Sequence, residues 1–233
     1  MKEQTIRTAM LLGEDLISSL DKKHVAVYGV GGVGSFCAEA LARAGVGHLT
    51  LIDDDVVSTS NLNRQLIALH STIGQFKTEV MAARIADINP ECQVTVFSRR
   101  YLPEDRELFF ETAPDYIADC IDSVACKTDL IATSISRQIP IISAMGTGNK
   151  LDPSQFVITD LSKTSGCPLA RVMRRELKQR GIVHHTVLYS LEAPTKPLFQ
   201  PDPNTVVPGS VSWVPSCAGL MMAGHIIRAL IEK

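Results

Sequence analysis

The chain has 233 residues, of which 45% are hydrophobic and 21% charged, and its formal net charge is −2. This length suits one α/β domain and leaves no room for a second large domain, and the composition is ordinary for a globular protein. A charge so close to zero excludes attraction of nucleic acid by the molecule as a whole, so such binding would need a local basic patch.

The start of the chain does not resemble a signal peptide, because residues 1–7 are polar and Met10–Leu20 has an amphipathic helix pattern. The apolar run Ala218–Ile231 is short for a membrane span and contains His225 and Arg228, so we expect a packed helix there. None of the six cysteines forms a C-x-x-C pair, so no zinc ribbon or redox motif is indicated. We therefore expect a cytoplasmic protein with no membrane partner.

A glycine-rich turn follows the first predicted strand, Val25–Tyr28, and precedes a helical pattern over Ser35–Ala44. Its glycines are Gly29, Gly31, Gly32 and Gly34. This order is typical of a turn whose backbone approaches a phosphate, while the helix N-terminus offers unpaired N–H groups. An incidental strand-to-helix turn is the alternative interpretation.

The next strand, His48–Ile52, ends at Asp53, about 20 residues after the glycines, where a carboxylate accepts the hydroxyls of a ribose. Its position favours the nucleotide interpretation of the glycine turn. The pattern does not identify which nucleotide is bound, since nicotinamide, flavin and ATP enzymes all share it.

Strands and helices continue to alternate. We expect helices over about 76–88, 104–110 and 123–137, and strands over Gln93–Phe97, Tyr116–Asp119 and Pro140–Ala144. This alternation predicts a Rossmann-like α/β fold, a mostly parallel sheet with helices on both faces.

The pattern changes after Lys150. We expect strands over Phe156–Thr159, Thr186–Ser190 and Ser210–Val214, adding antiparallel strands in the C-terminal half, and a basic helix over Leu169–Gln179. The proline-rich stretch 194–208 is either a functional lid or a disordered segment. We predict a single domain over 1–233, with a nucleotide-binding core over about 1–150 and a substrate-facing extension over about 151–233.

Charged side chains follow several of the predicted strands. Arg64, Lys77 and Asp122 all lie on segments that leave strand C-terminal ends, so we expect them to share one crevice with Asp53. Two cations and a further carboxylate suit a triphosphate with Mg²⁺ better than a nearly neutral nicotinamide ring.

Five sequence features together resemble the ubiquitin-activating-type adenylyltransferases. They are the glycine turn, Leu51-Ile-Asp53-Asp-Asp55, Asn61-x-Asn63-Arg64-Gln65, Lys77 and Asp119-x-x-Asp122. The resemblance implies that ATP and Mg²⁺ are bound and that a carboxylate is adenylated. It assigns nucleotide binding to Gly29, Gly31, Gly32, Gly34, Asp53, Asp55, Asn61, Arg64, Gln65 and Lys77. It implies catalytic roles for Arg64, Lys77 and Asp122, a metal ligand at Asp122, and Arg7 reaching the partner's ATP site across a homodimer.

The second half of the chain resembles the tRNA threonylcarbamoyladenosine dehydratases. The resemblance lies in Asp160-Leu-Ser-Lys-Thr, Cys167-Pro-Leu-Ala-Arg171 and Arg174-Arg-Glu-Leu. It implies adenylation of the threonyl carboxylate of a modified adenosine in tRNA, followed by ring closure within the substrate and net loss of water. The pairs of C-x-x-C found in molybdopterin and thiamine adenylyltransferases are missing here.

The residues support a tRNA partner independently. Arg171, Arg174, Arg175 and Lys178 recur at the spacing of one helix face, and Lys163 precedes them. Such a cationic ridge fits contact with a phosphate backbone, although an ordinary solvated face is the alternative.

Cys217 precedes the C-terminal apolar run, where a helix N-terminus can activate a thiol. It is either a small packing residue or a sulfur or acyl acceptor working with a cysteine desulfurase system. Binding of a monovalent cation is left undecided, and no residues are assigned to it.

Three other functions stay open. An adenylyltransferase that activates the C-terminal carboxylate of a sulfur-carrier protein would share the whole ATP half. A nicotinamide or flavin oxidoreductase would share only the glycine turn and Asp53. A tRNA-binding scaffold without catalysis would not need Lys77 or Asp122.

Overall fold

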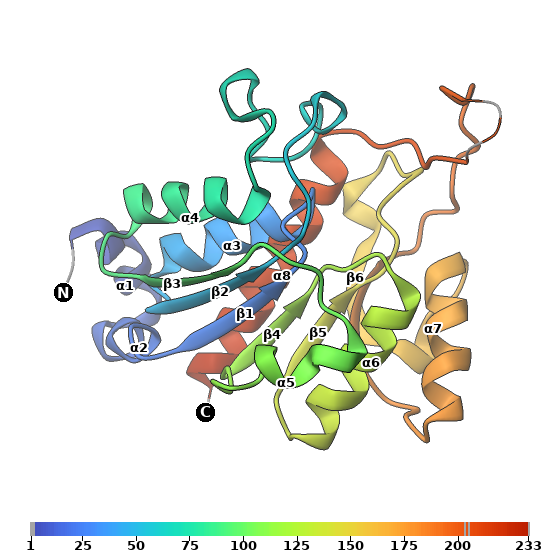
Figure 1. Ribbon diagram of the computed structural model, residues 1–233. Coiled ribbons are helices and arrows are strands. Elements are labelled where there is room, and N and C mark those ends of the chain that lie inside the picture. Colours follow the sequence, from blue (N-terminus) through green and yellow to red (C-terminus); the bar gives the residue numbers. More distant parts are fainter. Residues whose placement is uncertain (1–2, 203, 205, 233) are drawn as a thin grey trace.

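A seven-stranded sheet in the order β3-β2-β1-β4-β5-β7-β6 runs through the computed structural model, which describes residues 3–202, 204 and 206–232 (Figure 1). The strands are β1 (His24–Tyr28), β2 (His48–Ile52), β3 (Gln93–Phe97), β4 (Tyr116–Asp119), β5 (Ile141–Ala144), β6 (Phe156–Asp160) and β7 (Thr186–Ser190). Neighbouring strands are parallel except β6, which is antiparallel to β7. The predicted mostly parallel sheet with an antiparallel addition in the C-terminal half is confirmed.

Helices cover both faces of the sheet (Figure 1). They are α1 (Ile6–Leu12), α2 (Glu14–Leu20), α3 (Gly34–Ala44), α4 (Lys77–Ile88), α5 (Arg106–Phe109), α6 (Val124–Ser136), α7 (Pro168–Gln179) and α8 (Trp213–Ile231). One hydrophobic core lies between the sheet and α3, α4 and α8, and a second lies between the sheet and α5, α6 and α7. Because both faces are covered, the central strand β1 is buried along its whole length.

Two predicted elements are wrong. The helix pattern over Met10–Leu20 is divided into α1 and α2, because Gly13 has φ +92° and ψ 151°, a conformation that no helix can continue. The segment Ser210–Val214 forms no strand, since α8 already begins at Trp213. A short alternation of apolar residues fits a strand or a helix start equally well, and Pro215 is tolerated in a first helical turn.

β6 and β7, which belong to the predicted extension, continue the sheet of the predicted core. The proline-rich stretch 194–208 lies outside the sheet, and Pro203 and Thr205 lie outside the described residues. The division of the chain near residue 150 stays a prediction.

Within the described residues, α8 is long and apolar enough to cross a membrane by length and composition alone. Its buried side chains, Val214, Ala218, Met222, Ala223 and Ile226, belong to the core shared with α3. A buried core helix has the same length and composition as a membrane span, so these properties alone do not indicate one.

α8 and α3 pack backbone to backbone at Gly219. A Cβ atom added there would lie 2.2 Å from the carbonyl oxygen of Val33 and 3.0 Å from the backbone nitrogen of Cys37. No side chain fits at this crossing, so the glycine determines how closely α8 approaches the start of α3.

We expect Gly219→Ala to lower the free energy of unfolding by about 1–3 kcal/mol, because the helices must separate. Gly224→Ala, on the same helix, is the matched control. Nothing lies within 4 Å of a Cβ added at Gly224, and alanine favours a helix by about 1 kcal/mol over glycine. Urea unfolding of both variants checks this, and equal stabilities would contradict the close packing.

Candidate functional site

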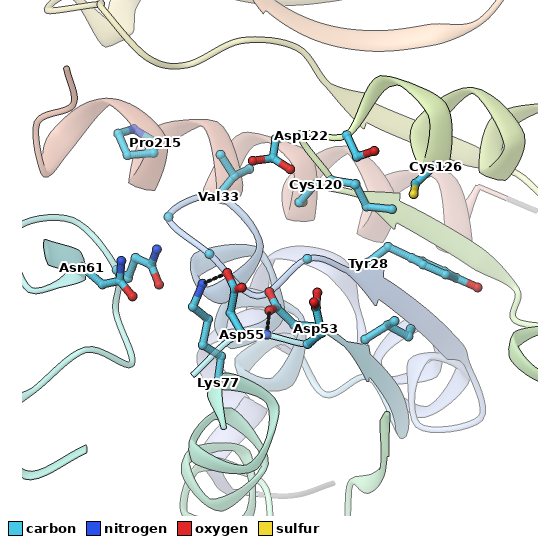
Figure 2. A pocket seen from close by; sticks show the side chains of 18 of the residues that line it. Tyr28, Val33, Asp53, Asp55, Asn61, Lys77, Cys120, Asp122, Cys126 and Pro215 are labelled. Atoms are coloured by element: carbon cyan, nitrogen blue, oxygen red, sulfur yellow. Dashed lines mark hydrogen bonds and ion pairs between the residues drawn. The ribbon is translucent and has the colours of Figure 1, made fainter. Parts of the chain in front are cut away.

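A pocket of about 430 Å³ opens at the C-terminal ends of β1, β2 and β4 (Figure 2). β1 lies between β2 and β4, so the strand order reverses here, the usual ligand position in such sheets. Most of the predicted nucleotide-site residues line it: Gly29, Gly31, Gly32, Asp53, Asp55, Asn61, Arg64, Gln65, Lys77 and Asp122. Gly34 and Arg7 do not line it.

The glycine turn joins β1 to α3. A Cβ atom on Gly34 would lie 1.8 Å from the carbonyl oxygen of Gly29, so helix and strand meet at a distance that excludes any side chain. Gly31 and Gly32 are half-buried and present their backbone to the pocket. The local geometry is that of an anion cradle ahead of a helix N-terminus.

Asp53 holds this turn in place. Its Oδ2 accepts the N–H of Val30 at 2.6 Å, and its Oδ1 accepts the N–H of Asp55 at 2.9 Å. Burial raises the pKa of the Asp53 carboxyl above its ordinary value, although Lys77 and these two N–H groups favour the ionised form. Asp53 is therefore a structural anchor of the pocket as well as a lining residue.

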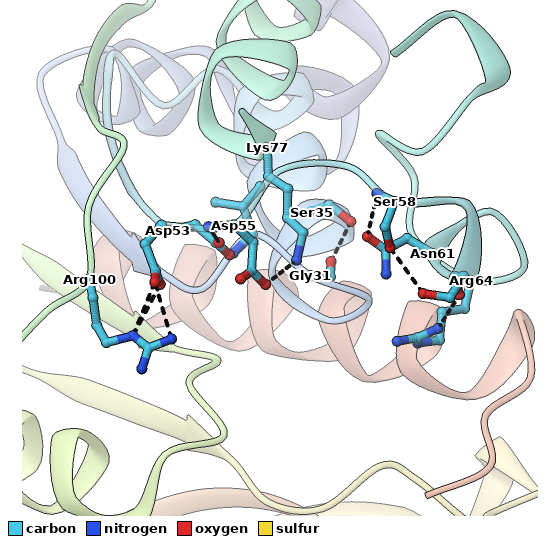
Figure 3. A network of polar contacts seen from close by, with 12 residues as sticks. Gly31, Ser35, Asp53, Asp55, Ser58, Asn61, Arg64, Lys77 and Arg100 are labelled. Atoms are coloured by element: carbon cyan, nitrogen blue, oxygen red, sulfur yellow. Dashed lines mark hydrogen bonds and ion pairs between the residues drawn. The ribbon is translucent and has the colours of Figure 1, made fainter. Parts of the chain in front are cut away.

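Three consecutive carboxylates, Asp53, Asp54 and Asp55, lie beside each other, with oxygen atoms within 4.8 Å of one another. Lys77, the first residue of α4, donates from Nζ to Asp55 Oδ2 at 2.6 Å (Figure 3). Arg100 pairs with Asp54 at 3.1 Å from the other side. Asp122 lies across the pocket from Asp53 and Asp55 (Figure 2), so hard oxygen ligands suited to Mg²⁺ face the same space.

Arg64 lies just after a short 3-10 helix, Thr59–Asn61. Its Nη1 donates to the carbonyl of Ser60 at 2.9 Å and to Asn63 Oδ1 at 3.0 Å, which aligns the half-buried guanidinium along the pocket wall. The buried Oε1 atom of neighbouring Gln65 has no hydrogen-bond partner within the described chain. An unpaired buried acceptor on a polar pocket wall fits a ligand that brings a donor.

A buried ion pair supports the opposite wall. Lys127 of α6 donates from Nζ to Asp119 Oδ2 at 2.7 Å, and both side chains are 0% exposed. Asp119 Oδ1 also accepts the N–H of Ile121, at 3.1 Å. The pair thus fixes the turn that carries Asp122.

Lys127 was not among the predicted site residues, although its position eight residues after a strand-ending aspartate is visible in the sequence. Several lining residues were not predicted either: Tyr28, Asp54, Arg100, Tyr101, Cys120, Cys126, Thr147, Ser210 and Pro215. Tyr28, Asp54 and Cys120 lie within or directly beside the predicted motifs, whereas the contribution of the others depends on chain segments meeting in space.

The cysteines that line the pocket are not the one predicted as a possible reactive thiol. Cys120 and Cys126 line the pocket, and burial raises the pKa of the Cys120 thiol well above its ordinary value. Cys217 is half-buried in α8 and does not line the pocket. The pocket wall therefore carries thiols other than the predicted one, and that of Cys120 is held in its protonated form.

The basic residues of α7 are not equivalent. Arg171, Arg175 and Lys178 are exposed, as is Lys163 before the helix. Arg174 is half-buried and donates to the backbone carbonyl of Thr164 at 2.8 Å, so part of its function is structural.

α7 begins close to the pocket. A Cβ on Gly146 would lie 3.9 Å from Cys167 Sγ, at the start of α7, and Thr147 lines the pocket. The start of α7 therefore lies next to a segment that contributes to the pocket wall.

Comparisons with known proteins identify relatives over the whole chain. The ThiF family matches residues 4–233. The tRNA threonylcarbamoyladenosine dehydratase of Bacillus subtilis is 43% identical over 246 residues, covering 100% of this chain and 96% of that protein. The crystal structure of the Escherichia coli tRNA N6-threonylcarbamoyladenosine dehydratase in complex with ATP has a TM-score of 0.91 at 36% identity, covering 99% of this chain and 94% of that one. The Escherichia coli molybdopterin-synthase adenylyltransferase is 38% identical over 126 residues, covering 54% of this chain and 50% of that protein.

We expect Lys127→Met to lower the free energy of unfolding by about 3–5 kcal/mol, because Asp119 would be left as a buried unpaired charge. Lys77→Met is the matched control: its partner Asp55 is 59% exposed, so the loss should stay below about 1 kcal/mol. Chemical denaturation at neutral pH measures both. Equal losses of unfolding free energy would mean that the buried Asp119–Lys127 pair stabilises the fold no more than the Lys77–Asp55 pair does.

Proposed function

The chain belongs to the ThiF family, and we propose that it is an ATP-dependent enzyme that dehydrates and cyclises threonylcarbamoyladenosine in tRNA. The observation that carries this proposal is the extent of the likeness. Similarity to the dehydratases spans the whole chain, including the extension with α7, whereas similarity to a molybdopterin-synthase adenylyltransferase covers only about half of it. The sulfur-carrier alternative is therefore not favoured.

In the first proposed step, an oxygen of the threonyl carboxylate attacks the α-phosphorus of ATP, and the bond to the bridging oxygen breaks to release pyrophosphate. Arg64, Lys77 and the backbone N–H groups of the glycine turn would stabilise the negative charge on the phosphates. Asp53 lines the same pocket and would accept ribose hydroxyls with its remaining lone pairs.

In the second step, a nitrogen of the same substrate attacks the activated carbonyl carbon. The bond between this carbon and the oxygen attached to phosphorus breaks, so AMP leaves. The nitrogen loses its proton, and over both steps the substrate has lost the atoms of one water. Because the attack is intramolecular, proximity is sufficient and no protein nucleophile is needed. Cys217 does not line the pocket, so the proposed reaction assigns it no role, and the reaction as written needs no sulfur donor.

Magnesium fits the chemistry of the pocket. Asp122 and the Asp53–Asp55 group supply hard carboxylate oxygens on facing walls. When bound, Mg²⁺ would supply neutralisation of phosphate charge. Among the described residues, none indicates a site for a monovalent cation.

The tRNA would contact the basic surface of α7. Arg171, Arg175 and Lys178 are exposed on a helix whose start adjoins the segment that contributes Thr147 to the pocket, so they are available to backbone phosphates of the bound tRNA. A tRNA substrate supports a cytoplasmic location.

A homodimer would complete the site. Arg7 is exposed on α1 and does not line the pocket of its own chain. Neighbouring Met10 and Leu11 are 79% and 87% exposed, an apolar surface that a second copy could cover. We propose that Arg7 reaches the pocket of the partner subunit.

The proposed reaction is tested with ATP, Mg²⁺ and threonylcarbamoylated tRNA, by measuring AMP release and the mass of the nucleoside. We expect the nucleoside to lose one water, and Lys77→Met or Asp122→Asn to reduce kcat/KM by about 100-fold or more. Lys22→Met, an exposed lysine away from the pocket, is the control and should keep full activity.

Other outcomes select the alternatives. An unchanged nucleoside mass, with pyrophosphate exchange that requires a carrier protein ending in Gly-Gly, would select the sulfur-carrier adenylyltransferase. Unaltered function of Lys77→Met would favour a scaffold.

Mixing two inactive variants tests the role of Arg7. In a heterodimer of Arg7→Ala with Lys77→Met, one pocket has its own Lys77 and receives an intact Arg7 from the partner. We expect the equilibrated mixture to recover about a quarter of the wild-type rate, since half of the dimers are mixed and each has one complete site. If sedimentation shows dimers but the mixture recovers no activity, Arg7 acts on the pocket of its own chain.

A further inference from the structure

The described residues 196–202, 204 and 206–208, which we call the stacking loop, lie between two segments that a single residue joins. Asn149 accepts the N–H of Thr195 on its carbonyl at 2.8 Å and donates its own N–H to the carbonyl of Gly209 at 2.7 Å. Its side-chain Oδ1 accepts the N–H of Gly209 at 2.6 Å. Both ends of the loop are therefore fixed to one point after β5.

The preceding residues reinforce this attachment. The carboxylate of Glu192 accepts the N–H groups of Leu151 and Asp152 at 2.9 and 3.0 Å. Prolines such as Pro197, Pro201 and Pro208 restrict the backbone beyond the anchors. Fixed ends and proline content reduce the entropy that the loop would lose on binding a partner.

The loop holds apolar side chains out in solvent. Leu198 is fully exposed, Phe199 is 78% exposed and Val206 is 92% exposed. Clustered apolar side chains of this kind are typical of a binding surface. None of them belongs to either hydrophobic core.

The loop adjoins both the pocket and α7 through the segment 146–149. Thr147 lines the pocket, a Cβ on Gly148 would lie 2.8 Å from Pro208 Cβ, and Gly146 adjoins Cys167 at the start of α7. Figure 1 shows the stacking loop projecting on the same side of the molecule as α7. Four consecutive residues therefore contact the start of α7, the wall of the pocket and the base of the stacking loop.

We propose that Leu198 and Phe199 form a platform on which unpaired bases of the tRNA stack beside the reacting nucleoside. This inference rests on the proposed function. A nucleoside inserted in the pocket must leave its flanking nucleotides at the pocket mouth, where the stacking loop is attached. Single-stranded RNA is recognised by aromatic stacking together with cationic contacts to the backbone, and the stacking loop and α7 offer these two chemistries side by side.

The test compares Phe199→Ala, Phe199→Trp and wild type in the full chain, with threonylcarbamoylated tRNA as the probe. We expect Phe199→Ala to raise the KM and the Kd for tRNA about tenfold, since stacking on one base has about that effect. The KM for ATP and the rate at saturating tRNA should stay unchanged. Phe199→Trp should keep wild-type affinity, and its added tryptophan emission should be quenched by tRNA.

Ile135→Ala, an exposed apolar residue at the far end of α6, is the matched control and should bind tRNA like wild type. If the wild type is active and Phe199→Ala binds tRNA with wild-type affinity, the stacking role is overturned. A changed sedimentation coefficient of Phe199→Ala with unaltered tRNA affinity would also overturn it, because the loop would then be covered by a second copy. Failure of the wild type to release AMP would instead refute the proposed function.

Discussion

The contact between Gly34 and the carbonyl of Gly29 is the constraint on which the rest of the site depends. Because a Cβ would lie 1.8 Å from that oxygen, α3 can start directly against the end of β1 only with glycine there. The short turn between them leaves backbone rather than side chains facing the pocket. Asp53 then ties the turn to the end of β2 through Val30. The phosphate cradle and the acidic segment are thus one unit.

Two of the cations around this cradle are paired with carboxylates. Lys77 faces Asp55 and Arg100 faces Asp54, whereas Arg64 donates to the oxygens of Ser60 and Asn63. In the proposed function the cations would face the polyphosphate and the carboxylates would face the metal, and the positive and negative charges nearly balance. A site for a nearly neutral nicotinamide ring would not require so many charges. Behind one wall, the buried Asp119–Lys127 pair gives the turn with Asp122 a rigid base.

The segment 146–149 connects this chemistry to the surface. It contributes Thr147 to the pocket, contacts the start of α7 through Gly146, and closes the stacking loop through Gly148 and Asn149. In the proposed function, α7 would hold the backbone of the tRNA and the stacking loop would hold its bases, both through contacts with this segment.

The sequence by itself determined the strand–glycine–helix unit, the mostly parallel character of the sheet and a group of charged side chains that share the pocket. These follow from local periodicity and from the rule that parallel strands end at one edge, so Asp53, Arg64, Lys77 and Asp122 could be brought together without coordinates. The local rules failed where several structures fit one pattern, as at Ser210–Val214. Only the tertiary structure decided that Lys127 neutralises Asp119, that Arg100 faces Asp54, and that Asn149 closes the stacking loop. Each of these contacts joins residues on different elements, and the packing of those elements determines the distance between them.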